Sequence, residues 1–212
     1  MTQALLVSTV LLWVAVVALT AVVLALVRQI GVLHERVFPV GALVTPGGPR
    51  VGAAAPAPAA VRDLAGRPVA LGGPDPDGAR TLLFFVSPTC PVCKTLLPVV
   101  LDLARAERPP ARVVLASDGD PAEHRAFVAR AGLADVPYVL SSELGVLYQV
   151  AKLPYAVLID GAGVLRAKGL VNTREHVESL FEAERLGVAS VQEYLREHDD
   201  EHGPPARTRG TA

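Results

Sequence analysis

The chain has only two cysteines, Cys90 and Cys93, and they lie three positions apart in the stretch F-V-S-P-T-C-P-V-C-K. Residues i and i+3 of a helix share one face about one turn apart, so the two sulfurs can form a disulfide with little movement of the backbone. A pair with this spacing could carry out thiol-disulfide exchange, close a structural loop, or supply half of a metal site.

The expected position of the pair at the start of a helix gives the two sulfurs different roles. Cys90 is expected at the N-cap and Cys93 in the first turn, and Pro91 suits the first helical position. The free backbone N–H groups and the positive end of the helix dipole favour the thiolate of Cys90. We therefore predict that Cys90 is the attacking sulfur and that Cys93, which is more buried, resolves the mixed disulfide.

The other two interpretations have less support from the sequence but stay open as alternatives. A disulfide across three residues closes too small a loop to stabilise the fold much through chain entropy. A structural zinc site needs four ligands, and no spacing among the five histidines completes one: His34, His124, His176, His198 and His202. We therefore expect no metal and no cofactor, unless a partner completes a shared site.

Alternating strands and helices are expected to hold the pair in place. A short apolar run bounded by turn residues predicts a buried strand directly before the cysteines. Capping and periodicity predict the other elements. In chain order, the expected elements are strand 80–86, helix 91–106 kinked at Pro98, strand 111–116, helix 121–131 capped by Asp120, an extended piece 138–140, the hairpin 155–160 and 164–168, helix 173–184, and helix 188–196. This order indicates an α/β fold with a central mixed sheet flanked by helices.

The N-terminus has the composition of a transmembrane helix. Residues 4–27 carry no charge and would form a helix roughly 36 Å long, enough to cross a hydrocarbon core of about 30 Å. A cleaved signal peptide is the alternative, but no basic segment precedes the run. We expect an anchor over residues 1–28, a juxtamembrane segment and linker over 29–50, a folded domain over 51–197, and a disordered tail over 198–212.

The charge of the chain limits its partners and bears on its topology. The net charge is −1, with 20 basic and 21 acidic residues, so we expect no binding of nucleic acid. Arg28 and Arg36 after the span weakly favour a cytoplasmic domain by the positive-inside rule. Disulfide chemistry favours an oxidising compartment instead. We expect a single pass through a bacterial inner membrane with the domain on the periplasmic side.

The domain resembles the thioredoxin superfamily, in which a strand, a CxxC motif and a helix are followed by an X-Pro-strand segment. The matching residues are the cysteine motif and Leu153-Pro154-Tyr155 before an apolar run. The resemblance implies that Pro154 is cis and lies beside the cysteines, with Pro137 as the competing proline. It implies a substrate groove that includes Leu153, Pro154 and Tyr155, although a core tyrosine is the other interpretation of Tyr155. Thr89, Pro91 and Lys94 would support the cysteines.

Two departures from the superfamily pattern leave the direction of electron flow open. Thioredoxin has an aromatic residue before the first cysteine and a buried acid six positions before it, where this chain has Thr89 and Phe84. Without that acid, the proton of Cys93 would leave through water or through a residue that the pattern does not identify. The Cys-Pro start resembles bacterial disulfide oxidants, but Val92 supplies no positive charge.

A narrower resemblance covers the whole chain. The segments R-Q-I-G-V-L-H-E-R, F-V-S-P-T-C-P-V-C-K and G-L-V-N-T-R-E-H resemble the MauD family of methylamine dehydrogenase accessory proteins. This implies a membrane-anchored thiol-disulfide oxidoreductase that assists maturation of the cysteine-rich small subunit of methylamine dehydrogenase, together with a redox partner that the sequence does not identify. The alternatives are a tethered reductant for cytochrome c maturation and a non-catalytic assembly factor.

Overall fold

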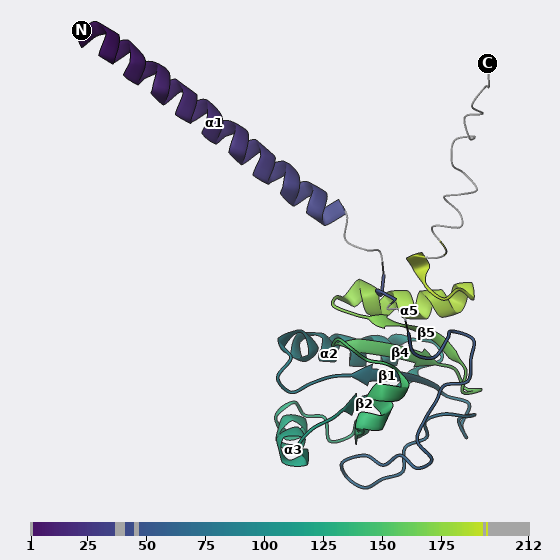
Figure 1. Cartoon of the computed structure of the whole chain (residues 1–212). Helices are drawn as coiled ribbons and strands as arrows, with labels where there is room; N and C mark the ends of the chain where they lie inside the picture. The colour runs from purple at the N-terminus through teal and green to yellow at the C-terminus, as the bar shows by residue number, and fades with distance from the viewer. Residues whose placement is uncertain (1, 37–40, 45–46, 193, 195–212) are drawn as a thin grey trace, which may run out of the picture. The chain divides into compact units, whose positions relative to one another are not determined.

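The computed structural model describes residues 2–36, 41–44, 47–192 and 194, in two compact units, Met1–Pro39 and Val40–Ala212. The first unit is helix α1 (Thr2–Arg36) (Figure 1). Its segment Val7–Leu26 has a mean hydropathy of 2.7, and none of it is buried within the structure. The hydroxyl of Thr20 donates to the Val16 carbonyl at 2.8 Å, so this polar group is satisfied inside the helix. The helix is long and apolar enough to cross a membrane, as predicted.

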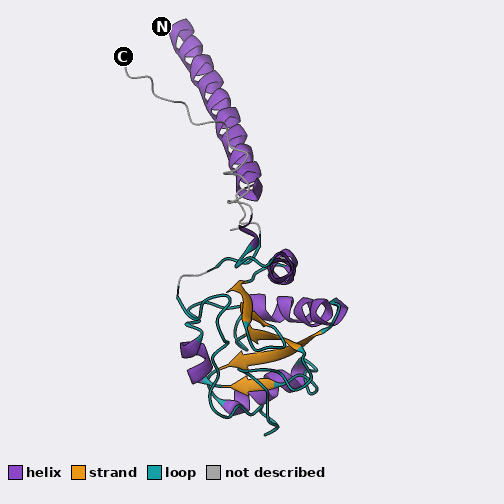
Figure 2. Cartoon of the chain, turned by 90° about the vertical axis from the view of Figure 1, so that its right-hand side faces the viewer, coloured by secondary structure: helices purple, strands orange, loops and turns teal. Residues whose placement is uncertain are grey.

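The second unit is built on a mixed sheet of five strands, coloured orange in Figure 2. The strand order is β3-β2-β1-β4-β5; β1 pairs in parallel with β2 and β2 with β3, while β4 is antiparallel to both β1 and β5. The strands are β1 (Arg80–Phe85), β2 (Ala111–Ser117), β3 (Tyr138–Leu140), β4 (Tyr155–Ile159) and β5 (Leu165–Leu170). This confirms the predicted α/β fold and central mixed sheet.

Side chains from both faces of the central strand β1 are buried, because successive residues of a strand point to opposite faces. Leu82 and Phe84 pack with residues of three helices, α2 (Pro91–Ala106), α3 (Pro121–Arg130) and α5 (Arg174–Leu186). Leu83 and Phe85 pack on the other face with α4 (Ser142–Leu147) and with Ala55 and Val61, which precede β1 in the chain. The sheet is therefore covered on both faces, which explains why β1 is an unbroken apolar run.

The helix ends follow from local sequence. The Asp120 carboxylate accepts the Glu123 N–H at 3.1 Å, and the Thr173 hydroxyl accepts the His176 N–H at 3.4 Å. Gly187 ends α5 with a φ of 69°, a left-handed conformation that glycine adopts at low cost. These contacts confirm the predicted cap at Asp120, and of the two candidates for the cap of α5, Asn172 and Thr173, they show that it is Thr173.

Two elements differ from the prediction. Part of the segment 29–50, predicted as a juxtamembrane segment and linker, pairs with the sheet: Leu43 exchanges two backbone hydrogen bonds with Leu170 of β5. Within the predicted domain, Ala54 forms a bridge with Val164, and Ala55 is buried. Backbone pairing of this kind needs no side-chain periodicity, so the sequence pattern did not show it. Helix α4 was not predicted either. The predicted tail 198–212 lies outside the described residues, and of the predicted helix 188–196 only residues 191, 192 and 194 are described as helical.

Candidate redox site

The two cysteines are joined by a disulfide where β1 gives way to α2. Their Cα atoms are 5.3 Å apart, and Cys90 is the N-cap of α2 with extended backbone (φ −81°, ψ 112°). The N–H of Cys93 donates to the Cys90 sulfur at 3.2 Å. The Cys90 sulfur therefore lies where the unpaired N–H groups of the first helical turn converge, as predicted.

The two sulfurs differ in exposure. Cys93 is fully buried and packs with Val86, Leu96 and Leu97, whereas Cys90 is only partly buried. Phe84, at the position where thioredoxin has its buried acid, is 0% exposed and belongs to the same apolar cluster. An incoming sulfur can therefore reach Cys90 but not Cys93, and Phe84 offers Cys93 no group that could accept its proton.

A groove of about 460 Å³ lies beside Cys90, and we call it the Cys90 groove. It is built by four chain segments, which are the end of β1 with the loop to Cys90, the end of β2, the start of α4, and the loop before β4. Its lining residues are Phe85, Val86, Ser87, Thr89, Cys90, Ala116, Ser117, Asp118, Ser141, Gly145, Val150, Ala151, Lys152 and Leu153. The groove brings together three of the expected site residues, Cys90, Thr89 and Leu153. Lys94, Pro91, Pro154 and Tyr155 are not among its lining residues.

The Leu153–Pro154 peptide bond is cis, whereas the bond before Pro137 is not among the cis bonds of the described residues. This confirms the expected isomer at Pro154. Pro154 is buried, and its carbonyl accepts the Val171 N–H at 3.1 Å. Of the two interpretations of Tyr155, the structure supports the core one over the groove one, because the side chain is 2% exposed and its ring meets Phe85 edge-on with centroids 6.3 Å apart. Tyr155 is therefore a core residue that supports the Phe85 wall of the groove from behind.

Several polar groups of the groove were not predicted. The Ser117 hydroxyl donates to the Val86 carbonyl at 2.7 Å, and the hydroxyls of Ser87 and Thr89 are 2.9 Å apart. Ser117 ends β2, and Ser87 closely follows the end of β1. Since the carboxyl ends of parallel neighbouring strands meet at one edge of a sheet, the predicted strands could have brought these serines together. Lys152 carried no such signal, because the fold of the loop before Pro154 places it in the groove.

A buried pair, His124 and Tyr138, holds the loop that carries Asp118. Both residues are 2% exposed. Burial raises the pKa of Tyr138 to about 12, and its hydroxyl forms a hydrogen bond with Nδ1 of His124 at 2.8 Å. Nε2–H of His124 then donates to the Asp118 carbonyl at 2.8 Å. These contacts hold Asp118, which lines one wall of the Cys90 groove.

Within the described residues, no three side chains of histidine, cysteine, aspartate or glutamate are placed to share a metal ion. The arrangement is instead suited to sulfur chemistry. An N-cap sulfur with access to a groove and a buried neighbour one turn away can form, exchange and reform a disulfide.

Solved structures similar to the chain share its fold. One is the thioredoxin domain of a thiol-disulfide oxidoreductase from Bacteroides vulgatus, with 19% identity and a TM-score of 0.53, covering 64% of this chain and 98% of that one. Another is described as a thiol:disulfide interchange protein DsbE from Chlorobium tepidum, with 20% identity and a TM-score of 0.54, covering 65% of this chain and 96% of that one. These likenesses show a thioredoxin-like fold, as the sequence predicted.

Sequence comparison is more specific. No protein-family model matches the chain. A relative from Paracoccus denitrificans named methylamine utilization protein MauD is 50% identical over 195 residues, which are 92% of this chain and 96% of the relative. A relative of the same name from Methylorubrum extorquens is 48% identical over 204 residues, which are 96% of this chain and 98% of the relative. At this identity over nearly the full length of both sequences, the chain belongs to the MauD family of methylamine utilization proteins.

Proposed function

We propose that the protein is a membrane-anchored thiol-disulfide oxidoreductase that acts through Cys90 and Cys93. The observation that carries this proposal is the Cys90–Cys93 disulfide at the N-terminus of α2, with Cys90 lining an open groove and Cys93 fully buried. A disulfide that served only as a staple would not need one sulfur beside a groove.

In the oxidising direction, a client thiolate attacks the Cys90 sulfur. The Cys90–Cys93 bond breaks, a bond forms between the client and Cys90, and Cys93 leaves as a thiolate that takes up a proton. A second client thiolate attacks the client sulfur of this mixed disulfide and releases the Cys90 thiolate. The client gains one disulfide, and its two electrons remain on the cysteine pair. The reverse sequence reduces or rearranges a client disulfide.

The start of α2 stabilises the charge that appears on Cys90. Its free N–H groups and dipole favour an anion by about 0.3–1 kcal/mol at an exposed site. This lowers the pKa of a thiol at the N-cap and makes Cys90 the better leaving group in the second step. Because Phe84 carries no acid, the proton for Cys93 comes from water or from another residue.

We infer that the client is the small subunit of methylamine dehydrogenase. The support is membership of the MauD family, whose similar members are named for methylamine utilization. A subunit dense in disulfides needs its cysteines paired correctly, and a tethered exchange domain supplies that chemistry. We also propose that the domain lies on the extracytoplasmic side of the membrane with α1 as the anchor, since disulfide chemistry favours an oxidising compartment, and that Leu153 of the groove, next to Pro154, contacts the client.

Trapping the mixed disulfide tests this proposal. Cys93→Ala removes the resolving sulfur, so the small subunit should accumulate as an adduct that thiol reductants dissolve. Cys90→Ala is the matched control and should give no adduct. A Cys90→Ser, Cys93→Ser double variant that fully supports maturation would show that the protein is a non-catalytic assembly factor. Loss of covalent haem with normal amine dehydrogenase would assign the protein to cytochrome c maturation instead.

A further inference from the structure

A second cleft, separate from the Cys90 groove, lies between α2 and the end of α3. It encloses about 470 Å³ and shares no lining residue with that groove. We call it the α2–α3 cleft. Lys94, the residue after Cys93, lines it, so the cleft begins one residue beyond the disulfide.

The interior of this cleft is apolar and largely prebuilt. Leu97, Phe127 and Leu133 line it and are 4%, 5% and 3% exposed, so their positions are fixed by the core. Leu101, one turn after Leu97, extends the apolar wall along α2. Pro98 also lines the cleft and has no N–H, so the Lys94 carbonyl lacks its usual intrahelical donor and is free to accept a hydrogen bond. The surface therefore combines an apolar floor with one backbone acceptor.

The rim of the cleft is cationic. Lys94 and Arg130 are both exposed lining residues. Neither forms an ion pair with another described residue, whereas seven arginines elsewhere in the described chain do: Arg67, Arg80, Arg105, Arg112, Arg166, Arg174 and Arg185. Two unpaired cations beside an apolar floor complement a segment that presents apolar side chains flanked by carboxylates.

We propose that the α2–α3 cleft docks an acidic, apolar segment of the protein that recycles the Cys90–Cys93 pair. This inference rests on the proposed exchange activity. Each client event moves two electrons between the client and the pair, so a second protein with its own cysteine pair must move two electrons the opposite way before the next event. That second protein must also exchange with Cys90, because Cys93 is fully buried.

The Cys90 groove and the α2–α3 cleft differ in chemistry, so each could bind a different partner. The lining of the Cys90 groove includes four hydroxyl-bearing residues, Ser87, Thr89, Ser117 and Ser141, together with apolar ones, whereas the α2–α3 cleft is apolar with a cationic rim. A partner held in the cleft could reach Cys90 without using the contacts that select the client. The protein would thereby separate recognition of its client from recognition of its recycling partner.

The test compares charge reversals in the full-length protein in its membrane. Arg130→Glu reverses a rim charge, and Ala131→Glu places a carboxylate on the same lining. Arg125→Glu is the matched control, because Arg125 is an exposed residue of the same helix that does not line the cleft. The ratio of reduced to oxidised Cys90–Cys93 in growing cells is measured by thiol alkylation. Both cleft variants should shift this ratio at least threefold, and Arg125→Glu should leave it at the wild-type value.

A second measurement separates this inference from the proposed function. Purified wild type and all three variants should react with glutathione disulfide or glutathione at rates within twofold, since that reaction needs no docking. A wild-type protein that fails to react would overturn the proposed exchange activity itself.

An unchanged redox ratio in both cleft variants would overturn only the docking proposal, as would an equal shift in Arg125→Glu. Loss of the client adduct when Arg130→Glu is added to Cys93→Ala would assign the cleft to the client instead. Thermal unfolding of each variant identifies any that fails to fold. If one cleft variant fails, the redox ratio of the other cleft variant decides whether the docking proposal holds.

Discussion

Cys90 and Cys93 occupy the same helical turn but different environments. The sulfur at the N-cap borders a groove, while the other is enclosed by Val86, Leu96 and Leu97. Attack by another protein is therefore directed to one of the two sulfurs, and the order of bond breaking follows from this difference in access.

After reduction, we predict that the Cys90 thiol is alkylated at least ten times faster than the Cys93 thiol. Access and the helix N-terminus both favour reaction at Cys90. Single-cysteine variants, Cys93→Ser and Cys90→Ser, isolate the two rates, which mass spectrometry can follow with iodoacetamide. Equal rates for the two variants would contradict the asymmetry described for the site.

Asp160 provides a prediction about pH. Burial alone would raise the pKa of this carboxyl, but the N–H groups of Val164 and Ala162 and the Arg166 guanidinium, at 2.7 Å, outweigh burial and lower the pKa. A carboxyl with a lowered pKa stabilises the fold above the pKa it has when unfolded and loses that contribution as the pH falls through its folded pKa.

We therefore expect Asp160→Asn to reduce the free energy of unfolding by about 1–2 kcal/mol at pH 7 and by much less near pH 2.5. Urea unfolding at pH 7, 4 and 2.5 measures the difference. The control is Asp102→Asn, whose side chain is 73% exposed in its ion pair with Arg105 and should change stability by less than about 0.5 kcal/mol at any pH. A difference from wild type that did not depend on pH would contradict the assignment.

The His124–Tyr138 pair gives a prediction about the wall of the groove. Tyr138→Phe leaves Nδ1 of the buried His124 without its hydrogen-bond partner, which costs about 1–3 kcal/mol of stability. Tyr148→Phe is the comparison, since Tyr148 is equally buried but its hydroxyl has no hydrogen bond to another described residue. Thermal unfolding should show a clear drop for the first variant and a small one for the second. Equal drops would show that the contact with His124 contributes little.

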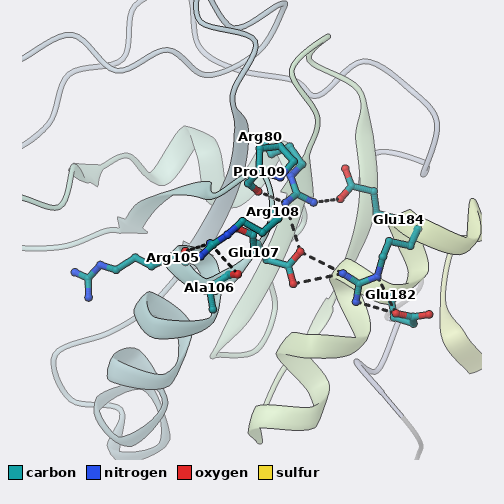
Figure 3. A network of polar contacts seen from close by, with 9 residues as sticks. Arg80, Arg105, Ala106, Glu107, Arg108, Pro109, Glu182 and Glu184 are labelled. Atoms are coloured by element: carbon teal, nitrogen blue, oxygen red, sulfur yellow. Dashed lines mark hydrogen bonds and ion pairs between the residues drawn. The ribbon is translucent and has the colours of Figure 1, made fainter.

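At the scale of elements, an ion network ties β1 to the C-terminal ends of α2 and α5 (Figure 3). Arg80 pairs with Glu184 at 2.7 Å and with Glu107 at 3.4 Å, and it also donates to the Pro109 carbonyl. Its guanidinium carbon lies 5.6 Å from the centre of the Phe181 ring. Arg185 of α5 forms a second ion pair with Glu107, at 3.2 Å. The network forms at the opposite end of β1 from the disulfide, so it stabilises the framework without taking part in exchange.

Because the Arg80 side chain is only 13% exposed, the loss of its main partner leaves a poorly solvated charge. We expect Glu184→Ala to destabilise the protein by about 1–3 kcal/mol, with Glu107 offsetting part of the loss. Glu178→Ala breaks the exposed pair with Arg174 and should cost less than about 0.5 kcal/mol. Chemical denaturation of the two variants measures both, and the glutathione reaction should be unchanged in each. Similar losses in both variants would show that burial does not strengthen this network.

The elements that position the disulfide follow closely from sequence, because their signals are local. The apolar run of β1, Pro91 at the start of α2, and the caps at Asp120 and Thr173 each act within a few residues. Helix α4 was not predicted because it has only six residues, one of them Gly145, and depends on burial of Leu144. The bridge between Ala54 and Val164 joins residues far apart in sequence through backbone alone.

The difference between local signals and contacts that form only in the folded chain also explains what could be predicted of the site. The sulfurs were predicted because their residue type and spacing carry the chemistry, and the cis proline was predicted from the resemblance to the thioredoxin superfamily. The groove depends on four segments that only the folded sheet brings together, so Ser117, Asp118 and Lys152 had no local signal. The burial of Tyr155 follows from its register opposite Phe85 on the next strand, which a single sequence does not give.

At the scale of the whole molecule, helix α1 is long and apolar enough to cross a membrane, and we propose that it anchors the protein there. We expect the full chain to remain in the membrane fraction after alkaline carbonate, because Val7–Leu26 is apolar along its length. In intact cells treated with a reductant, a membrane-impermeant maleimide should label Cys90 before lysis. Labelling only after lysis would place the domain on the cytoplasmic side, as Arg28 and Arg36 alone would favour.

Retention in the bilayer by the 20-residue apolar segment Val7–Leu26, as proposed above, would also change how strong the protein's contacts need to be. Two molecules held at the same bilayer search a thin layer rather than a bulk volume, and tethering of this kind produces effective concentrations on the order of millimolar. Encounters are then frequent even when each contact is brief. Interfaces with weak affinity are sufficient under these conditions, and rapid release leaves the domain free to bind its next partner.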